Sequence, residues 1–272
     1  HKMKDWRKYN GALIPSIPPH LEVDTTDLDK FIKEEGVYFA RWTTNFDYKK
    51  ETEFWYVICD EKLDISDYSK NTRNQIRRGL RNCEVKLIDK KEVLKDGFES
   101  YIAAFLKYNT HLEAKSEEDF HQELDFLGLE WEFWGIYNDG NMIGYCQNKI
   151  SNSTCDYSTI KFHPDYLKLY PSYALFYTMN RYYLNKKGFK YVNDGARSIS
   201  HETNIQSFLI KKFKFRKSYC KLNIIYSPKV KFILTIIYPF KSIISLLNFG
   251  PFIKMSILIN HEKIRRSYEK GN

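Results

Sequence analysis

The pattern of apolar and polar positions is clearest in the middle of the chain, where it predicts a mixed α/β unit. Apolar runs over 134–137 and 142–147 flank Asn138-Asp139-Gly140-Asn141. An Asp-Gly pair between apolar runs is the strongest short-range signal of a β-hairpin. A third strand is expected over 155–162, and Pro164 ends it because proline has no N–H to donate to a ladder.

The segment after this strand predicts helix, strand and helix. Apolar side chains between 175 and 183 repeat at three-to-four spacing, with Ser172 as a candidate N-cap. Lys186-Lys187-Gly188 closes the helix, since cations suit the negative end of the helix dipole and glycine adopts a positive φ. A short strand over 189–192 then leads into Asn193-Asp194-Gly195, and a second helix follows. This order is typical of a mixed α/β fold and excludes a helix bundle or a sandwich.

The first 35 residues are expected to be largely irregular, because prolines at 15, 18 and 19 forbid a long helix. Asp24-Thr25-Thr26-Asp27 offers caps for one short helix. Strands are predicted over 37–42 and 54–59. The second is a continuous apolar run, as expected of a strand that is covered on both faces.

A predicted helix over 72–82 carries a row of cations on one face. Thr72 and Gln75 stand at capping-box spacing, and no acidic residue occurs from 70 to 81. The row, at i, i+4 and i+8, consists of Arg73, Arg77 and Arg81. Like charges at this spacing repel, so the row either faces an acidic surface or binds an anion. Phosphates of a coenzyme, a nucleotide-linked sugar, a tRNA acceptor end or a lipid head group would all suit it.

The C-terminal region is strongly apolar. Between 232 and 253 the only charged residue is Lys241, and the stretch approaches the length of a membrane span. Pro239, Asn248 and Gly250-Pro251 interrupt it, which predicts two short apolar helices, over 232–240 and 242–249, instead of one span. These helices either dock on the body of the protein or lie on a membrane surface.

Four segments are therefore expected along the chain. They are an irregular segment (1–35), a first half (36–130) with further helices near 98–106 and 116–127, a core (131–227), and an apolar helical tail (228–272).

Composition indicates which partners and which cellular compartment to expect. The net charge is +9, from 43 basic and 34 acidic residues, which favours anionic partners or simply reflects a lysine-rich surface. The five cysteines are odd in number, widely spread and without a C-x-x-C pair. This pattern fits neither a disulfide framework nor a zinc site, so we expect no metal and a reducing, cytoplasmic compartment.

The predicted order of elements resembles the core of the GNAT N-acyltransferases. The second helix resembles that family's closing motif, an Asn, a small residue three on, then Tyr, Lys, Gly and Phe. The matching positions are Asn204, Ser207, Ile210, Lys212, Lys214 and Phe215. Residues 69–81 are similar to a segment of Fem-type aminoacyltransferases, which build peptidoglycan bridges on a duplicated GNAT fold. The two resemblances touch about two thirds of the chain, and the second implies that 36–130 is a degenerate GNAT-like copy.

The resemblance also implies a donor site on a splayed strand and at the start of the following helix. The implied positions are Ser158, Ile160, Lys168, Ser172, Tyr173 and Asn204. The glycines that let backbone N–H groups cradle pyrophosphate in the family are absent here, and Pro171 has no N–H at all. This departure disfavours acetyl-coenzyme A. Acyl-coenzyme A, aminoacyl-tRNA and a carrier-protein-linked acyl group stay open as donors.

Candidate catalytic residues cluster around the strand that ends near 194. Asp194 is the first candidate base, because open α/β sheets place ligands at the carboxyl ends of their strands. Asp156 on the third strand is the second, and His201 is an alternate base. Partial burial would raise a carboxyl pKa toward a useful range. Arg197 and Ser198 follow at once and are expected, with the arginine row, to bind the substrate or an anion. The family's tyrosine acid is Ile210 here.

The resemblance implies an acyltransferase that moves an acyl or aminoacyl group to an amine of a cell-envelope or polysaccharide precursor. The expected partners are a small-molecule or lipid-linked amine, tRNA, and the inner membrane face, contacted peripherally through 232–253. One alternative is a catalytically silent GNAT-like module that binds an anionic ligand or RNA. Another is a membrane-surface scaffold that acts through the tail. Fold alone does not decide between these functions.

Overall fold

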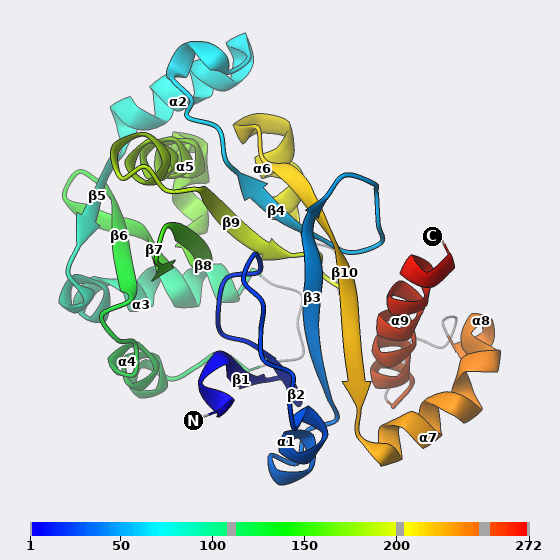
Figure 1. The fold of residues 1–272 in the computed structure, drawn as a ribbon. Helices are drawn as coiled ribbons and strands as arrows, with labels where there is room; N and C mark the ends of the chain where they lie inside the picture. Colours follow the sequence, from blue (N-terminus) through cyan, green and yellow to red (C-terminus); the bar gives the residue numbers. More distant parts are fainter. Residues whose placement is uncertain (1, 108–112, 200–203, 245–250, 271–272) are drawn as a thin grey trace. The chain divides into compact units, whose positions relative to one another are not determined.

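The structure is a computed structural model and describes residues 2–107, 113–199, 204–244 and 251–270 (Figure 1). The chain forms two compact units. Unit 1 comprises residues 1–56, 196–203 and 217–272, and unit 2 comprises 57–195 and 204–216. The boundary expected at 130 falls inside unit 2, and the one expected at 227 falls inside unit 1.

Unit 2 is built on a mixed sheet with the strand order β4-β9-β8-β7-β6-β5. Its strands are β4 (Trp55–Cys59), β5 (Glu84–Ile88), β6 (Trp131–Asn138), β7 (Asn141–Ser151), β8 (Thr154–Phe162) and β9 (Tyr191–Ala196). The predicted hairpin is confirmed: β6 and β7 pair antiparallel up to Asn138↔Asn141. Its turn has φ values of 48° at Asp139 and 81° at Gly140, the left-handed pair that a two-residue hairpin turn requires.

The helices of unit 2 lie between these strands. They are η2 (Ile65–Asp67), α2 (Lys70–Asn82), α3 (Lys90–Phe105), α4 (Glu117–Asp125), η3 (Pro164–Leu169), α5 (Pro171–Asn180), the π-helical η4 (Arg181–Lys186) and α6 (Asn204–Phe213). The helix predicted near 116–127 is confirmed as α4, and the Ser116 hydroxyl caps it by accepting the Asp119 N–H at 3.1 Å. Gly188, with φ of 68°, closes the α5–η4 segment as expected.

Two predicted helix starts are wrong. The capping residue of α2 is Ser69, whose Oγ accepts the Thr72 N–H at 3.3 Å, so the helix begins before Thr72. No side chain caps α5: Tyr170 precedes it in the left-handed region and Pro171 is its first residue. Proline is favoured at that position because its missing N–H would have no helical partner.

Helices pack both faces of the unit 2 sheet. One cluster joins α3 and α4 to β6 and β7 through buried side chains that include Tyr101, Phe120 and Tyr145. Around η4, the Tyr183 hydroxyl accepts the Trp134 Nε1–H at 2.9 Å and donates to a Glu132 carboxylate oxygen at 2.8 Å. Tyr183 is fully buried, so this network satisfies groups that water cannot reach.

Unit 1 has the strand order β1-β2-β3-β10. Its elements are η1 (Lys2–Asp5), β1 (Trp6–Tyr9), β2 (Ala12–Pro15), α1 (Leu28–Glu34), β3 (Phe39–Tyr48), β10 (Arg216–Tyr226), α7 (Pro228–Ile237), η5 (Tyr238–Phe240), α8 (Lys241–Ile244) and α9 (Pro251–Lys270). The irregular start predicted for the chain is partly wrong, because β1 and β2 form a hairpin around Asn10 and Gly11. Burial of Trp6, which is 5% exposed, supports these short strands.

The first short helix predicted in the tail, 232–240, lies within α7 and η5. Of the second, 242–249, the structure describes only the part in α8, and residues 245–249 lie outside the described residues. The helix α9, with 20 residues, lies in the segment predicted as a helical tail, but it was not predicted as a separate helix. Ile264 of α9 packs in a cluster with Phe54, Cys220 and Leu222, and the His261 ring lies 5.2 Å from that of Phe39. The α9 helix therefore docks on the strands of unit 1. Among the residues that the structure describes, no helix is long and apolar enough to cross a membrane.

Candidate functional site

The parallel strands β8 and β9 stop pairing partway along their length. Their register runs from Thr154↔Tyr191 to Asp156↔Asn193 and ends there, although β8 continues to Phe162 and β9 to Ala196. We call this point the split. The antiparallel partner β7 stays paired with β8 but shifts register, with Tyr157 opposite Asn148 and Thr159 opposite Gln147. Ser158 is therefore the extra residue of a β-bulge, a feature that bends a strand and is common near active sites.

Asp194 is the residue of β9 that directly follows the last pair. Burial raises the pKa of its carboxyl group to about 7. Burial, with a smaller contribution from the charge of Asp194, raises the pKa of Cys146 on β7. A carboxyl group with this pKa exchanges a proton near neutral pH, as a general acid or base requires.

The backbone around Asp194 is fixed by its neighbour. Asn193 donates from Nδ2 to a carboxylate oxygen of Asp156 at 2.8 Å, and its side-chain oxygen accepts the Gly195 N–H at 2.9 Å. Gly195 has φ of 94°, which a side chain would strain. The two candidate carboxylates thus lie on adjacent strands, with Asp156 held by a hydrogen bond and Asp194 following the split.

Of the other predicted site residues, Ser158 and Ile160 lie on β8 beyond the split. Ser158 is exposed in the bulge and Ile160 is half-buried further along β8. Arg197 and Ser198 belong to unit 1, where Arg197 donates to the Glu53 carboxylate at 2.8 Å and lies over the Trp55 ring at 4.7 Å. His201 lies outside the described residues.

The start of α5 is covered by α2 (Figure 1). The Tyr170 carbonyl accepts the N–H groups of Tyr173 and Ala174 at 3.1 and 3.3 Å, and Pro171 has none to offer. A Cβ on Gly79 of α2 would lie 2.6 Å from the Tyr170 oxygen, so the two backbones touch. The residues present therefore do not fit the pyrophosphate cradle that a coenzyme A donor would need here.

The other residues that the family resemblance implies for the donor site differ in exposure. Lys168 and Asn204 are exposed, and Ser172 is half-buried. The Tyr173 ring packs against Phe208 and Phe213 of α6, with centroids 5.1 and 5.7 Å away. Burial raises the pKa of Tyr173, so it keeps its proton at neutral pH.

The arginines of α2 differ in their contacts: Arg73 and Arg78 bind other groups of the protein, and the other two are exposed to solvent. Arg73 donates to the carbonyls of Ser66 and Tyr68 at 3.3 and 2.8 Å. Arg78, which flanks the row, lies over the Tyr170 ring at 4.6 Å and anchors α2 to α5. Arg77 and Arg81 are exposed, and in the described part of the chain neither forms an ion pair. These two cations are free to meet an anion.

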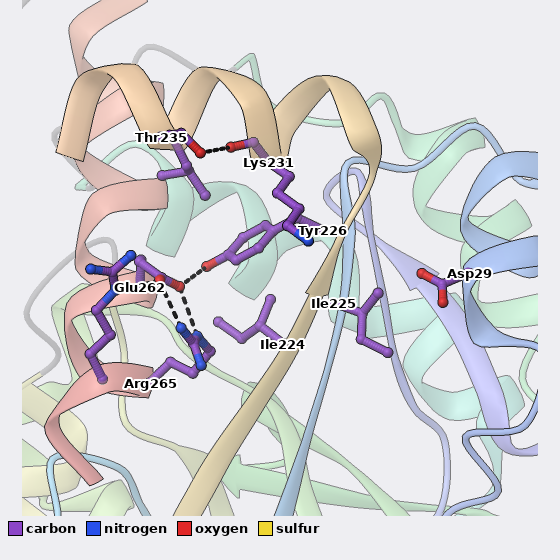
Figure 2. A pocket seen from close by; sticks show the side chains of 10 residues that line it. Asp29, Ile224, Ile225, Tyr226, Lys231, Thr235, Glu262 and Arg265 are labelled. Atoms are coloured by element: carbon purple, nitrogen blue, oxygen red, sulfur yellow. Dashed lines mark hydrogen bonds and ion pairs between the residues drawn. The ribbon is translucent and has the colours of Figure 1, made fainter. Parts of the chain in front are cut away.

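A cavity of about 480 Å³ lies in unit 1, between β10, α7 and α9 (Figure 2). At its centre the buried Glu262 accepts hydrogen bonds from the Tyr226 hydroxyl at 3.1 Å and from Arg265 and Arg266 at 2.6 to 2.9 Å. Burial by itself would raise the pKa of Glu262, but the two arginines outweigh it and lower the pKa. Sequence reasoning missed this cavity, although an acid with arginines at i+3 and i+4 is a recognisable pattern.

Comparison with known proteins supports the fold. No family model matches the sequence, and no curated protein matches it. The crystal structure of FemX is 11% identical over 85% of each chain, with a TM-score of 0.60. The C-terminal domain of a protein from Agrobacterium fabrum, named as a lysylphosphatidylglycerol synthetase, is 10% identical over 85% of this chain and 84% of that chain, with a TM-score of 0.52. The predicted GNAT-like fold with Fem-type relatives is confirmed.

Proposed function

We propose that this chain transfers an acyl or aminoacyl group to an amine of a cell-envelope or polysaccharide precursor. The observation that carries the proposal is Asp194, a carboxyl group with a pKa of about 7 directly after the split between β8 and β9. The fold it shares with FemX and with a protein named as a lysylphosphatidylglycerol synthetase supports this reaction class.

The reaction needs one proton acceptor and a place for a carbonyl group. The amine nitrogen attacks the carbonyl carbon of the ester, so that a C–N bond forms while the C–O bond breaks. The proton of the attacking amine goes to the Asp194 carboxylate, and Asp194 then returns a proton to the leaving oxygen. Past Asp156, no strand that the structure describes pairs with the β9-facing edge of β8, and backbone N–H groups there would hold the carbonyl oxygen.

The donor that these residues favour is aminoacyl-tRNA. The close contact between Gly79 and Tyr170 and the missing N–H of Pro171 disfavour a coenzyme A pyrophosphate at the start of α5. On the same helix, the exposed Arg77 and Arg81 are one turn apart and suit the phosphates of a nucleic-acid backbone.

The test of the proposed reaction is transfer of a radiolabelled amino acid from tRNA to a panel of muropeptide and amino-sugar acceptors. We expect Asp194→Asn to lower the transfer rate by roughly 100-fold or more, the usual contribution of a general base. Asp165→Asn, which removes an exposed carboxylate of the same unit, is the matched control and should leave the rate unchanged. The wild-type rate should rise with pH to a plateau above about 7, where Asp194 is ionised. Full activity of Asp194→Asn would refute the assignment.

The donor has a separate test. Changing Arg77 and Arg81 together to alanine should weaken tRNA binding and reduce the slope of log affinity against log salt by about 1.4, or about 0.7 per lost contact to a single strand. Lys62→Ala with Lys95→Ala is the control that changes the same net charge elsewhere in unit 2. An unchanged salt slope for the arginine pair would exclude this surface as the tRNA contact.

A second candidate function rests on Ile210, which stands where the family's acid tyrosine is expected. It is a silent module that binds RNA without catalysis. With such a module the arginine pair would still bind tRNA, no labelled product would form with any acceptor, and Asp194→Asn would leave tRNA binding unchanged.

A further inference from the structure

The helix α7 of unit 1 exposes an apolar surface on the side opposite to its docked face. Val230 and Leu234 are buried, at 6% and 5% exposure. The exposed residues, with their exposed fractions, are Phe232 (69%), Ile233 (42%), Ile236 (52%) and Phe240 (56%), and we call this set the apolar arc. At 3.6 residues per turn, positions four apart fall on one side of a helix, so the arc is continuous into η5. Exposed patches of this kind mark interaction surfaces.

The charged residues of the segment that carries the apolar arc, 228–241, are all lysines. Lys229, Lys231 and Lys241 are exposed beside it. In the sequence, no aspartate or glutamate occurs from 203 to 261. Two copies of such a surface would repel each other, whereas an anionic surface would be attracted. Apolar side chains flanked by lysines, without acids, are the composition of helices that lie in the interface of an anionic bilayer.

The cavity beside α7 is lined by basic side chains and by two acids, Asp29 and Glu262 (Figure 2). Lys231 and Thr235, one turn apart on α7, line the cavity on the side next to the apolar arc. Arg265 and Arg266 line it from α9 and share one carboxylate, Glu262. With Lys231, the cavity has three cations against the two acids Asp29 and Glu262, so its lining keeps a net positive charge.

We propose that α7 docks this protein on an anionic lipid bilayer. The apolar arc enters the boundary between head groups and acyl chains, the lysines lie among the head groups, and a head-group phosphate sits at the rim of the cavity near Lys231. This docking is independent of the proposed transfer reaction and does not use Asp194.

Vesicle flotation of the full chain tests the docking. The chain should float with vesicles of phosphatidylcholine and phosphatidylglycerol and not with phosphatidylcholine alone, and added salt should weaken the association. Phe232→Asp with Ile236→Asp should abolish flotation. The matched control is Phe126→Asp with Leu129→Asp, which adds the same charge at side chains of unit 2 that are 89% and 106% exposed. The control should float like the wild type.

The electrostatic part has its own variant. Changing Lys229 and Lys231 together to alanine should lower the partition onto anionic vesicles by roughly 25-fold, since each cation near such a surface contributes about 5-fold. Lys50→Ala with Lys95→Ala is the control, because it removes the same charge from two exposed lysines outside α7, and it should bind the vesicles like the wild type. The Asp194→Asn variant should float like the wild type even if it has lost transfer activity.

Three results would overturn the proposal. The first is that the chain does not float with anionic vesicles. The second is that the unit 2 control loses flotation as fully as the α7 variant. The third is gel filtration in which the wild type is a dimer and the α7 variant a monomer, which would assign the apolar arc to a second copy of the chain.

Discussion

The raised pKa of Asp194 makes a prediction about stability that does not depend on any substrate. In the folded protein this pKa is raised by burial from 3.8 to about 7. Between these two values the unfolded chain has released the proton and the folded chain still holds it. Stability therefore falls as pH rises through this window, by about 1.4 kcal/mol per pH unit for one group. Above pH 7 the ionised carboxylate is buried at a cost of roughly 2 to 4 kcal/mol, where the lower figure allows for water at the partly exposed side chain.

Asp194→Asn removes this titration, so the difference in unfolding free energy between variant and wild type should grow with pH. The variant should gain roughly 2 to 4 kcal/mol relative to the wild type between pH 4 and pH 8. Urea unfolding followed by tryptophan fluorescence at several pH values measures this difference. Other titrating groups cancel because they are common to both proteins, and Asp165→Asn is the exposed control.

A difference that stays constant from pH 4 to pH 8 would show that Asp194 is not buried in its protonated form. That result would also remove the support for Asp194 as a base near neutral pH. If the variant instead gains stability relative to the wild type as pH falls below about 5, the pKa of Asp194 is lowered in the folded protein. Asp194 would then be an ordinary carboxylate whose ionised form is stabilised by its surroundings.

The two other predictions concern packing in unit 2. Gly79→Ala should destabilise the protein by about 1 to 2 kcal/mol in thermal or urea unfolding, because the crowding of a Cβ 2.6 Å from a backbone oxygen outweighs the gain in helix propensity. Asn74→Ala on the exposed side of α2 should be neutral or stabilising, and equal effects at both positions would contradict the close helix contact. Tyr183→Phe should cost about 1 to 3 kcal/mol, because it leaves the buried indole N–H of Trp134 without its acceptor. Tyr182→Phe, at the neighbouring ring, should change stability by less than about 0.5 kcal/mol, and a similar loss there would refute the hydrogen-bond argument.

The sequence anticipated the parts of the site that depend on local signals. The hairpin at Asp139-Gly140 follows from φ values that few residue pairs tolerate, and α5 follows from its apolar period. Asp194 was singled out because it follows a buried strand, and its raised pKa agrees with that position. Its catalytic role stays a proposal.

The parts that sequence reasoning missed depend on contacts between distant segments. Gly79 carries no local sign that it must touch Tyr170, since a glycine in a helix reads only as a weak helix former. The buried Glu262 meets Tyr226 only because α9 packs along β10.

By itself, the sequence determined the hairpin turn and most of the order of strands and helices in unit 2, although it misplaced the first residues of α2 and α5. Turn geometry and apolar period are properties of a few consecutive residues, so they can be read from the chain directly. The tertiary structure alone decided that β3 pairs with β10, that α2 covers the start of α5, and that β8 and β9 part after Asp156. Each of these outcomes depends on which surfaces bury most apolar area together, and that depends on the whole fold.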